Sequence, residues 1–121
     1  MTTEDILKIL LALGAGGLIG LEREFRDKAA GFRTLIFICT GACLFTIFSA
    51  RLAGESDPTR IAANIVTGVG FLGAGVILHR DDPKGVHGLT TAASIWVVAA
   101  VGTAARLGLW RIGVASVFLL L

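Results

Sequence analysis

Long apolar stretches alternate with short charged ones along the chain. The apolar stretches lie at residues 6–21, 34–50, 61–78, 88–105 and 112–121. A helix of about 17–20 residues spans about 25–30 Å, close to the hydrocarbon thickness of a bilayer. The one charge inside the first stretch, Lys8, stands near its outer end and can snorkel to the boundary. The pattern predicts an all-α fold, a polytopic transmembrane helix bundle with four complete helices plus the start of a fifth.

The bounds of these helices follow from the charges between them. We place the helices at about 5–30, 33–51, 58–78, 89–105 and 111–121, within a single transmembrane domain over 1–121. Glu24 and Lys28 stand in the favourable i, i+4 order, so the first helix is expected to continue past the membrane toward a C-cap near Gly31. The fifth stretch reaches only about 15 Å, half a bilayer. We therefore expect the native polypeptide to continue beyond Leu121.

Positive charges near the helix ends predict the orientation in the membrane. The loop at 22–33 carries Arg23, Arg26, Lys28 and Arg33, more than any other loop. Cytoplasmic loops carry an excess of Lys and Arg, so this loop is expected in the cytoplasm and the N-terminus outside.

Composition supports a membrane protein and excludes several other classes. Apolar residues make up 55% of the chain, charged residues 17%, and the mean hydropathy is +0.81. A net charge of +2 without a basic, aromatic-rich patch excludes a nucleic-acid partner. Cys39 and Cys43 stand four apart in an apolar stretch and are interpreted as packing residues, in preference to a soft-metal pair.

Catalytic and cofactor-binding motifs are absent from the sequence. It contains no H-E-x-x-H, P-loop or Ser-His-Asp arrangement, and no carboxylate stands in the middle of a span. His79 and His87 flank a loop with two Asp residues, but equal numbers of cations there favour a solvated loop over a metal site. The chain is therefore expected to be no enzyme and to have no catalytic, cofactor-binding or metal-ligating residues.

Glycines concentrate in the third apolar stretch. Residues 68–73 match G-x-G-x-x-G, but no strand precedes them, so a dinucleotide site is rejected. The glycines at Gly68, Gly70, Gly73 and Gly75 instead predict close approach of a neighbouring helix. Each also weakens its helix by about 1 kcal/mol relative to Ala, so a broken third helix framing an ion or substrate site stays open as an alternative.

Polar residues at the helix ends and inside the spans are further candidates. Glu22 and Arg33 could form an ion pair across the first hairpin, or could be ordinary interfacial charges. The hydroxyl and amide side chains within the spans either bond helices together or line a polar cavity. They are Asn64 and Thr67 in the third stretch, and Thr90, Thr91 and Ser94 in the fourth.

Four sequence blocks resemble the MgtC/SapB family of bacterial membrane proteins. They are GLIGLERE (17–24), GFRT (31–34), IVTGVGFLGAGVI (65–77) and GLTTAASIW (88–96), and they occur in the family's order and spacing. The resemblance implies a bacterial inner-membrane protein tied to Mg²⁺ limitation and virulence, and a family member is reported to act on the F-type ATP synthase. Longer members carry a soluble C-terminal domain. The positions to test by family pattern are Glu22, Arg23, Glu24, Arg33, Thr34, Gly68, Gly73 and Thr91.

Two functions are compatible with these features. The first is a non-enzymatic membrane protein whose glycine faces bind helices of its own copies, as in a homodimer, or of another membrane protein such as ATP synthase. The alternative is a small transporter for a cation (Mg²⁺) or solute, with a path through a broken third helix. Asn64, Thr67, Thr90 and Thr91 would line that path.

Overall fold

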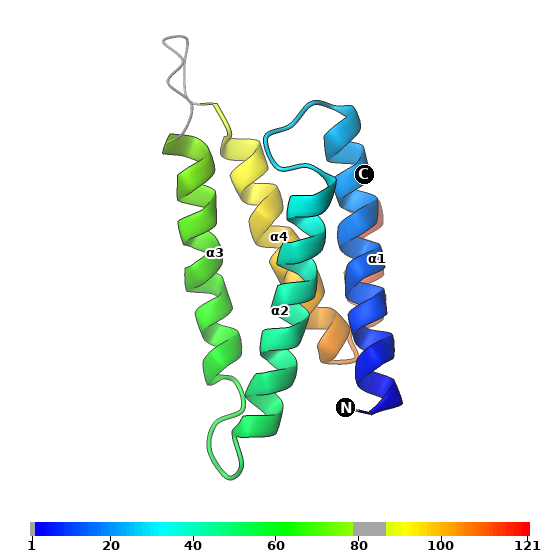
Figure 1. The fold of residues 1–121 in the computed structure, drawn as a ribbon, viewed down its shortest axis with the longest axis vertical. Coiled ribbons are helices and arrows are strands. Elements are labelled where there is room, and N and C mark those ends of the chain that lie inside the picture. Colours follow the sequence, from blue (N-terminus) through cyan, green and yellow to red (C-terminus); the bar gives the residue numbers. More distant parts are fainter. Residues whose placement is uncertain (1, 79–86) are drawn as a thin grey trace.

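The chain folds as an all-α bundle. The computed structural model describes residues 2–78 and 87–121, which contain no strand and form five helices (Figure 1). They are α1 (Thr3–Phe25), α2 (Phe32–Leu52), α3 (Arg60–Leu78), α4 (Leu89–Arg106) and α5 (Trp110–Leu120). Successive helices run in opposite directions, and α4 contacts all four of the others. The predicted fold class is confirmed.

Three of the helices are suited to cross a membrane. By length and composition α2, α3 and α4 could each do so. The longest helix, α1, has a charge-free run only over residues 9–21, between Lys8 and Glu22. At 1.5 Å per residue this run covers about 20 Å. The charges that flank this run, Lys8 and Glu22, therefore lie closer to the apolar layer of a membrane than the charges that flank the longer apolar runs of α2, α3 and α4.

The core forms where α1, α2 and α4 meet. Leu35, Cys39, Ile95 and Val98 are fully buried there. The helices approach so closely because glycine stands at the contact points. A Cβ on Gly20 would lie 2.7 Å from the Cα of Phe32, closer than a side-chain carbon can come. Glycine therefore allows close helix approach between α1 and α2.

The first helix is shorter than its sequence predicted. It ends at Phe25, not near residue 30, and Asp27 adopts a positive φ of 51° in the turn that follows. The reason lies in Glu24, whose carboxylate accepts a hydrogen bond from the backbone N–H of Phe32 at 2.7 Å. Glu24 thus caps the start of α2, and its expected helical partner Lys28 lies beyond the end of α1.

The third helix lies at the edge of the bundle and is unbroken. It is α-helical from Arg60 to Leu78, so the alternative of a break at its glycines is wrong. Breaking a helix in an apolar layer leaves backbone groups unsatisfied, at several kcal/mol each. That exceeds the cost of about 1 kcal/mol per glycine. Only Val69 and Gly73 of α3 are buried.

Candidate functional site

The candidate residues lie in two separate places. The charged residues and three of the threonines lie where α1, α2 and α4 meet near the α1–α2 turn, and the remaining candidates lie on α3. The first set consists of Glu22, Arg23, Glu24, Arg33, Thr34, Thr90 and Thr91. The second consists of Asn64, Thr67, Gly68, Gly70, Gly73 and Gly75. They therefore do not form one site.

In the first set, Arg23 joins α1 to α4. Its side chain is only 14% exposed, and its guanidinium donates a hydrogen bond to the hydroxyl of Ser94 on α4. That hydroxyl in turn donates to the backbone carbonyl of Thr90 at 2.8 Å. Thr91 and Ser94 are both buried. The interhelical polar contact expected in this region is thus made by Ser94, and its partner is Arg23, which lies just beyond the first apolar stretch.

Glu22 forms its ion pairs with Arg23 on α1 and with Arg26, the residue directly after α1. Its carboxylate lies 2.5 Å from the Nε of Arg26 and 3.6 Å from the Nε of Arg23. Among the described residues no ion pair joins it to Arg33, which is exposed on the first turn of α2 beside the exposed Thr34. The expected pair across the hairpin is therefore wrong. Arg26, at i+4 and directly after the last residue of α1, is within reach of Glu22 without crossing the turn.

The second set divides into packed and open glycines. A Cβ on Gly73 would lie 3.4 Å from the Cβ of Ala92, so Gly73 packs α3 against α4. A Cβ on Gly68, Gly70 or Gly75 would meet no atom within 4 Å. These three glycines are not needed for any contact within the described chain.

Open small residues form a continuous stripe on α3. Ala63, Thr67, Gly70 and Ala74 follow one another at intervals of four, three and four, so they share one helix face. All four are exposed, and we call this surface the small-residue face. In a membrane, small residues at this spacing allow the backbone of another helix to come close.

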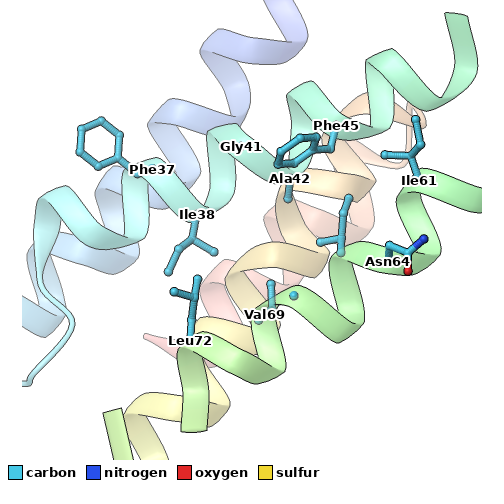
Figure 2. Close-up of a pocket in the computed structure, with 11 residues that line it drawn as sticks. Phe37, Ile38, Gly41, Ala42, Phe45, Ile61, Asn64, Val69 and Leu72 are labelled. Atoms are coloured by element: carbon cyan, nitrogen blue, oxygen red, sulfur yellow. The ribbon is translucent and has the colours of Figure 1, made fainter. Parts of the chain in front are cut away.

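A groove lies between α2 and α3, on the side of α3 away from this face. It has a volume of about 500 Å³ and is lined by apolar side chains of both helices, including Phe37 and Leu72 (Figure 2). Asn64 is the only one of the four predicted path residues in the lining. Its amide donates to the carbonyl of Arg60 on its own helix at 3.0 Å. The polar cavity that the transporter alternative requires is therefore not formed by these residues.

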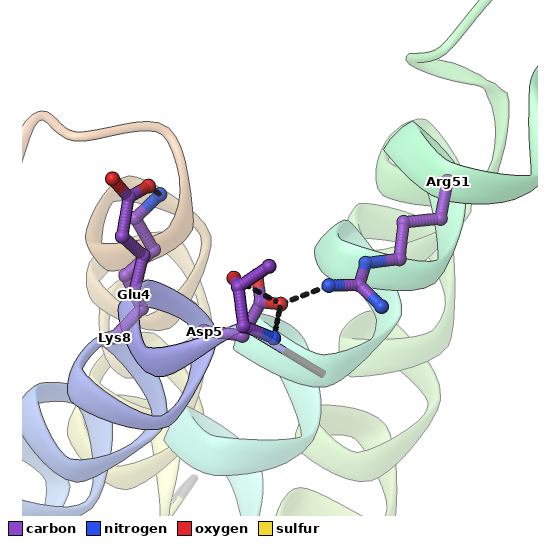
Figure 3. A network of polar contacts seen from close by, with 5 residues as sticks. Glu4, Asp5, Lys8 and Arg51 are labelled. Atoms are coloured by element: carbon purple, nitrogen blue, oxygen red, sulfur yellow. Dashed lines mark hydrogen bonds and ion pairs between the residues drawn. The ribbon is translucent and has the colours of Figure 1, made fainter.

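A further polar network at the opposite end of the bundle was missed from the sequence. Asp5 is buried and accepts hydrogen bonds from the N–H and the hydroxyl of Thr2, at 3.0 and 2.8 Å, and from the guanidinium of Arg51 (Figure 3). These hydrogen bonds, with the charges of Arg51 and Arg106, hold the pKa of Asp5 below its ordinary value of 3.8. The sequence carries a signal for this contact. Asp5 stands near the start of the first helix and Arg51 near the end of the second, and these two ends meet in an antiparallel hairpin.

Metal-ligating clusters are absent from the part of the chain that the structure describes. Residues 2–78 and 87–121 contain no group of three or more His, Cys, Asp and Glu side chains that could hold an ion. The loop with His79 that the sequence offered as a weak metal candidate lies outside the described residues, apart from His87.

Apolar helices packed through glycine, with charged networks at both ends, define a polytopic helical membrane protein. The chain belongs to the MgtC family, whose model matches residues 9–121.

Curated relatives agree with this assignment. Protein MgtC of Brucella abortus (strain 2308) is 49% identical over 106 residues, which are 87% of this chain and 44% of that protein. "Putative magnesium transporter YhiD" of Escherichia coli (strain K12) is 46% identical over 122 residues, 94% of this chain and 56% of that protein. Protein MgtC of Salmonella typhimurium (strain 14028s / SGSC 2262) is 43% identical over 116 residues, 96% of this chain and 49% of that protein. The chain thus spans about half the length of these relatives. No solved structure matches it.

Proposed function

We propose that this chain is a non-enzymatic protein of the bacterial inner membrane that supports growth when Mg²⁺ is scarce. It acts by binding a transmembrane helix of a partner on the small-residue face of α3. The partner is a second copy of the chain or another membrane protein, such as ATP synthase. In a pathogen we further propose a role in virulence, which the resemblance to the MgtC/SapB family implies.

The observation that carries the proposal is the open position of the glycines. Gly70 lies in the middle of a membrane-length helix, where a larger side chain would meet no atom of its own chain within 4 Å. Gly weakens a helix by about 1 kcal/mol relative to Ala. A glycine that gives no internal packing in return is suited to close contact with a helix from outside.

The proposed orientation places the α1–α2 turn in the cytoplasm and the N-terminus outside. It rests on the cations around that turn, Arg23, Arg26, Lys28 and Arg33. The exposed side chains of Arg26, Lys28 and Arg33 then face the cytoplasm.

Transport of Mg²⁺ is the second candidate function. It is favoured by the name of one relative, "Putative magnesium transporter YhiD". Against it stand the continuous α3 and the separation of the proposed path residues, since Thr67 is exposed on α3 and Thr91 is buried on α4. Flux of Mg²⁺ into vesicles that hold only the purified protein would favour transport over helix binding.

The proposal is tested by replacing Gly70 with Leu. The added side chain has room within the chain, so the protein should still insert and fold. It should hold a partner helix away and lower self-association, measured by energy transfer between labelled copies in vesicles, by at least about tenfold. If the partner is another protein, the same loss should appear in its co-purification and in growth at low Mg²⁺.

Gly14→Leu is the matched control. Gly14 is also an exposed helical glycine with no neighbour within 4 Å of an added Cβ, but it lies on α1. This variant should bind partners and support growth as the unchanged protein does. The proposal fails if Gly70→Leu and Gly14→Leu behave alike. Gly73→Leu is unsuitable for this test, because its side chain would collide with α4.

A further inference from the structure

The groove between α2 and α3 continues into a polar mouth. A second hollow of about 290 Å³ lies beside the turn that joins the two helices. Ser49, Ser56, Asp57 and Arg60 line it, together with apolar neighbours. Ile61 and Asn64 line both hollows, so the two are adjacent on the bundle surface. We call the two hollows together the α2–α3 groove.

The polarity of this groove changes once along its length. Its mouth lies at the start of α3, where Arg60 is exposed, and the rest runs between apolar side chains. The apolar part extends along α3 from Ile61 to Leu72, which is about 16 Å at 1.5 Å per residue. One leaflet of a bilayer has a hydrocarbon depth of about 15 Å. The apolar part therefore covers the depth of one leaflet, with the polar mouth at the membrane boundary.

The apolar part of the groove suits a hydrocarbon chain. It has a volume of about 500 Å³, and its lining is apolar apart from Asn64. Gly41 on α2 and Gly68 on α3 provide this room, since an added Cβ at either position would meet nothing within 4 Å.

The mouth contains one charge of each sign. The carboxylate of Asp57 accepts hydrogen bonds from the N–H and hydroxyl of Thr59, at 2.8 and 2.6 Å, and these bonds lower its pKa. Asp57 is therefore ionised at neutral pH, three residues before the cation Arg60. A headgroup with a phosphate and an ammonium group complements this pair better than a purely anionic one.

We propose that the α2–α3 groove binds one molecule of phosphatidylethanolamine. The phosphate binds Arg60, the ammonium binds Asp57, and one acyl chain lies along Gly41 and Gly68. This site is separate from the small-residue face of α3, so it does not depend on the proposed function. The lipid would fill the space between α2 and α3, where α3 packs less closely than it does against α4.

The test measures lipid retained by the purified chain. Protein in nanodiscs of equal parts phosphatidylethanolamine and phosphatidylglycerol is released into the gas phase, and bound lipids are identified by native mass spectrometry. The unchanged protein should retain one phosphatidylethanolamine in preference to phosphatidylglycerol. Gly68→Leu, which fills the apolar part, should lower this retention at least about fivefold.

Gly70→Leu is the control on the same helix. It lies outside the groove lining and should retain the lipid, while Gly68→Leu should keep its partner. Arg60→Gln should lower retention of both lipids, and Arg60→Lys should restore it. Asp57→Asn should remove the preference for phosphatidylethanolamine.

Three outcomes would overturn the proposal. Equal retention by Gly68→Leu and Gly70→Leu would mean that the lipid is not in the groove. Equal retention of both lipids by the unchanged protein would mean that only loosely bound surface lipid is present. Loss of self-association in Gly68→Leu without loss of lipid would mean that a second copy occupies the groove.

Discussion

Two glycines of α1 give a sharp test of the packing described above. Gly14 and Gly16 are two residues apart, yet an added Cβ would meet nothing within 4 Å at Gly14. At Gly16 it would lie 2.8 Å from both the Cβ of Cys39 and the carbonyl oxygen of Leu35. Ordinary contact begins at 3.4 Å, so Gly16→Ala must separate α1 from α2 by about 0.6 Å.

The magnitude follows from comparing the two alanine variants. Each gains about 1 kcal/mol of helix propensity, so this gain cancels in the difference between them. Overpacking of a tight core costs about 1–3 kcal/mol, and it applies to Gly16→Ala alone. The free energy of unfolding of Gly16→Ala should therefore lie about 2 kcal/mol below that of Gly14→Ala.

The assay is reversible unfolding in mixed detergent micelles, followed by circular dichroism. Gly14→Ala should be slightly more stable than the unchanged protein, and Gly16→Ala less stable. Equal stabilities for the two variants would refute the close approach of α1 and α2 at Gly16.

Three further predictions concern the polar contacts at the helix ends. Glu24→Ala should lower the free energy of unfolding by about 1 kcal/mol, because it removes the acceptor of the Phe32 N–H. Glu24→Gln keeps a side-chain oxygen that can accept this hydrogen bond, so it should retain most of that stability. A double-mutant cycle with Arg23→Ala and Ser94→Ala should give a coupling energy of about 1–2 kcal/mol in the same assay, and additive effects would contradict the contact. Asp5 has a lowered pKa, so its stabilising contribution is present above about pH 4 and is lost as the pH falls through the folded pKa. Asp5→Asn should therefore show a smaller fall in Tm than the unchanged protein between about pH 5 and 3, and identical falls would count against the network.

The spacing of charges predicted the number and order of the helices, because an apolar layer admits only long uncharged stretches. The same spacing misplaced the end of α1. The sequence shows Glu24 four residues before Lys28, a pattern that stabilises a helix. It does not show that the chain turns back at Asp27, which brings the N–H of Phe32 to that carboxylate. A contact across a turn competes with a contact along a helix, and only the fold decides between them.

The same limit applies to the candidate site. Gly16 and Gly70 both lie in glycine-containing apolar stretches, and the sequence predicted close approach of a neighbouring helix at Gly70. The structure separates them, because α1 lies against α2 whereas the outer side of α3 has no neighbour in the described chain. Which face of a helix is covered depends on the arrangement of all the helices, and residue spacing describes one helix at a time.

The open glycines of α3 matter because the described chain does not offset their cost. Gly68, Gly70 and Gly75 together weaken the helix by about 2–3 kcal/mol relative to alanine. Native domains have only about 5–15 kcal/mol of net stability, so this is a large fraction of the total. Gly16, Gly20 and Gly102 offset the same cost by letting helices pack closely. For the three glycines of α3 the compensating contact must come from outside the described chain, and a membrane supplies two candidates, lipid in the groove and a helix on the small-residue face. The two sets of leucine variants separate these contacts, because Gly68 lies in the groove and Gly70 does not.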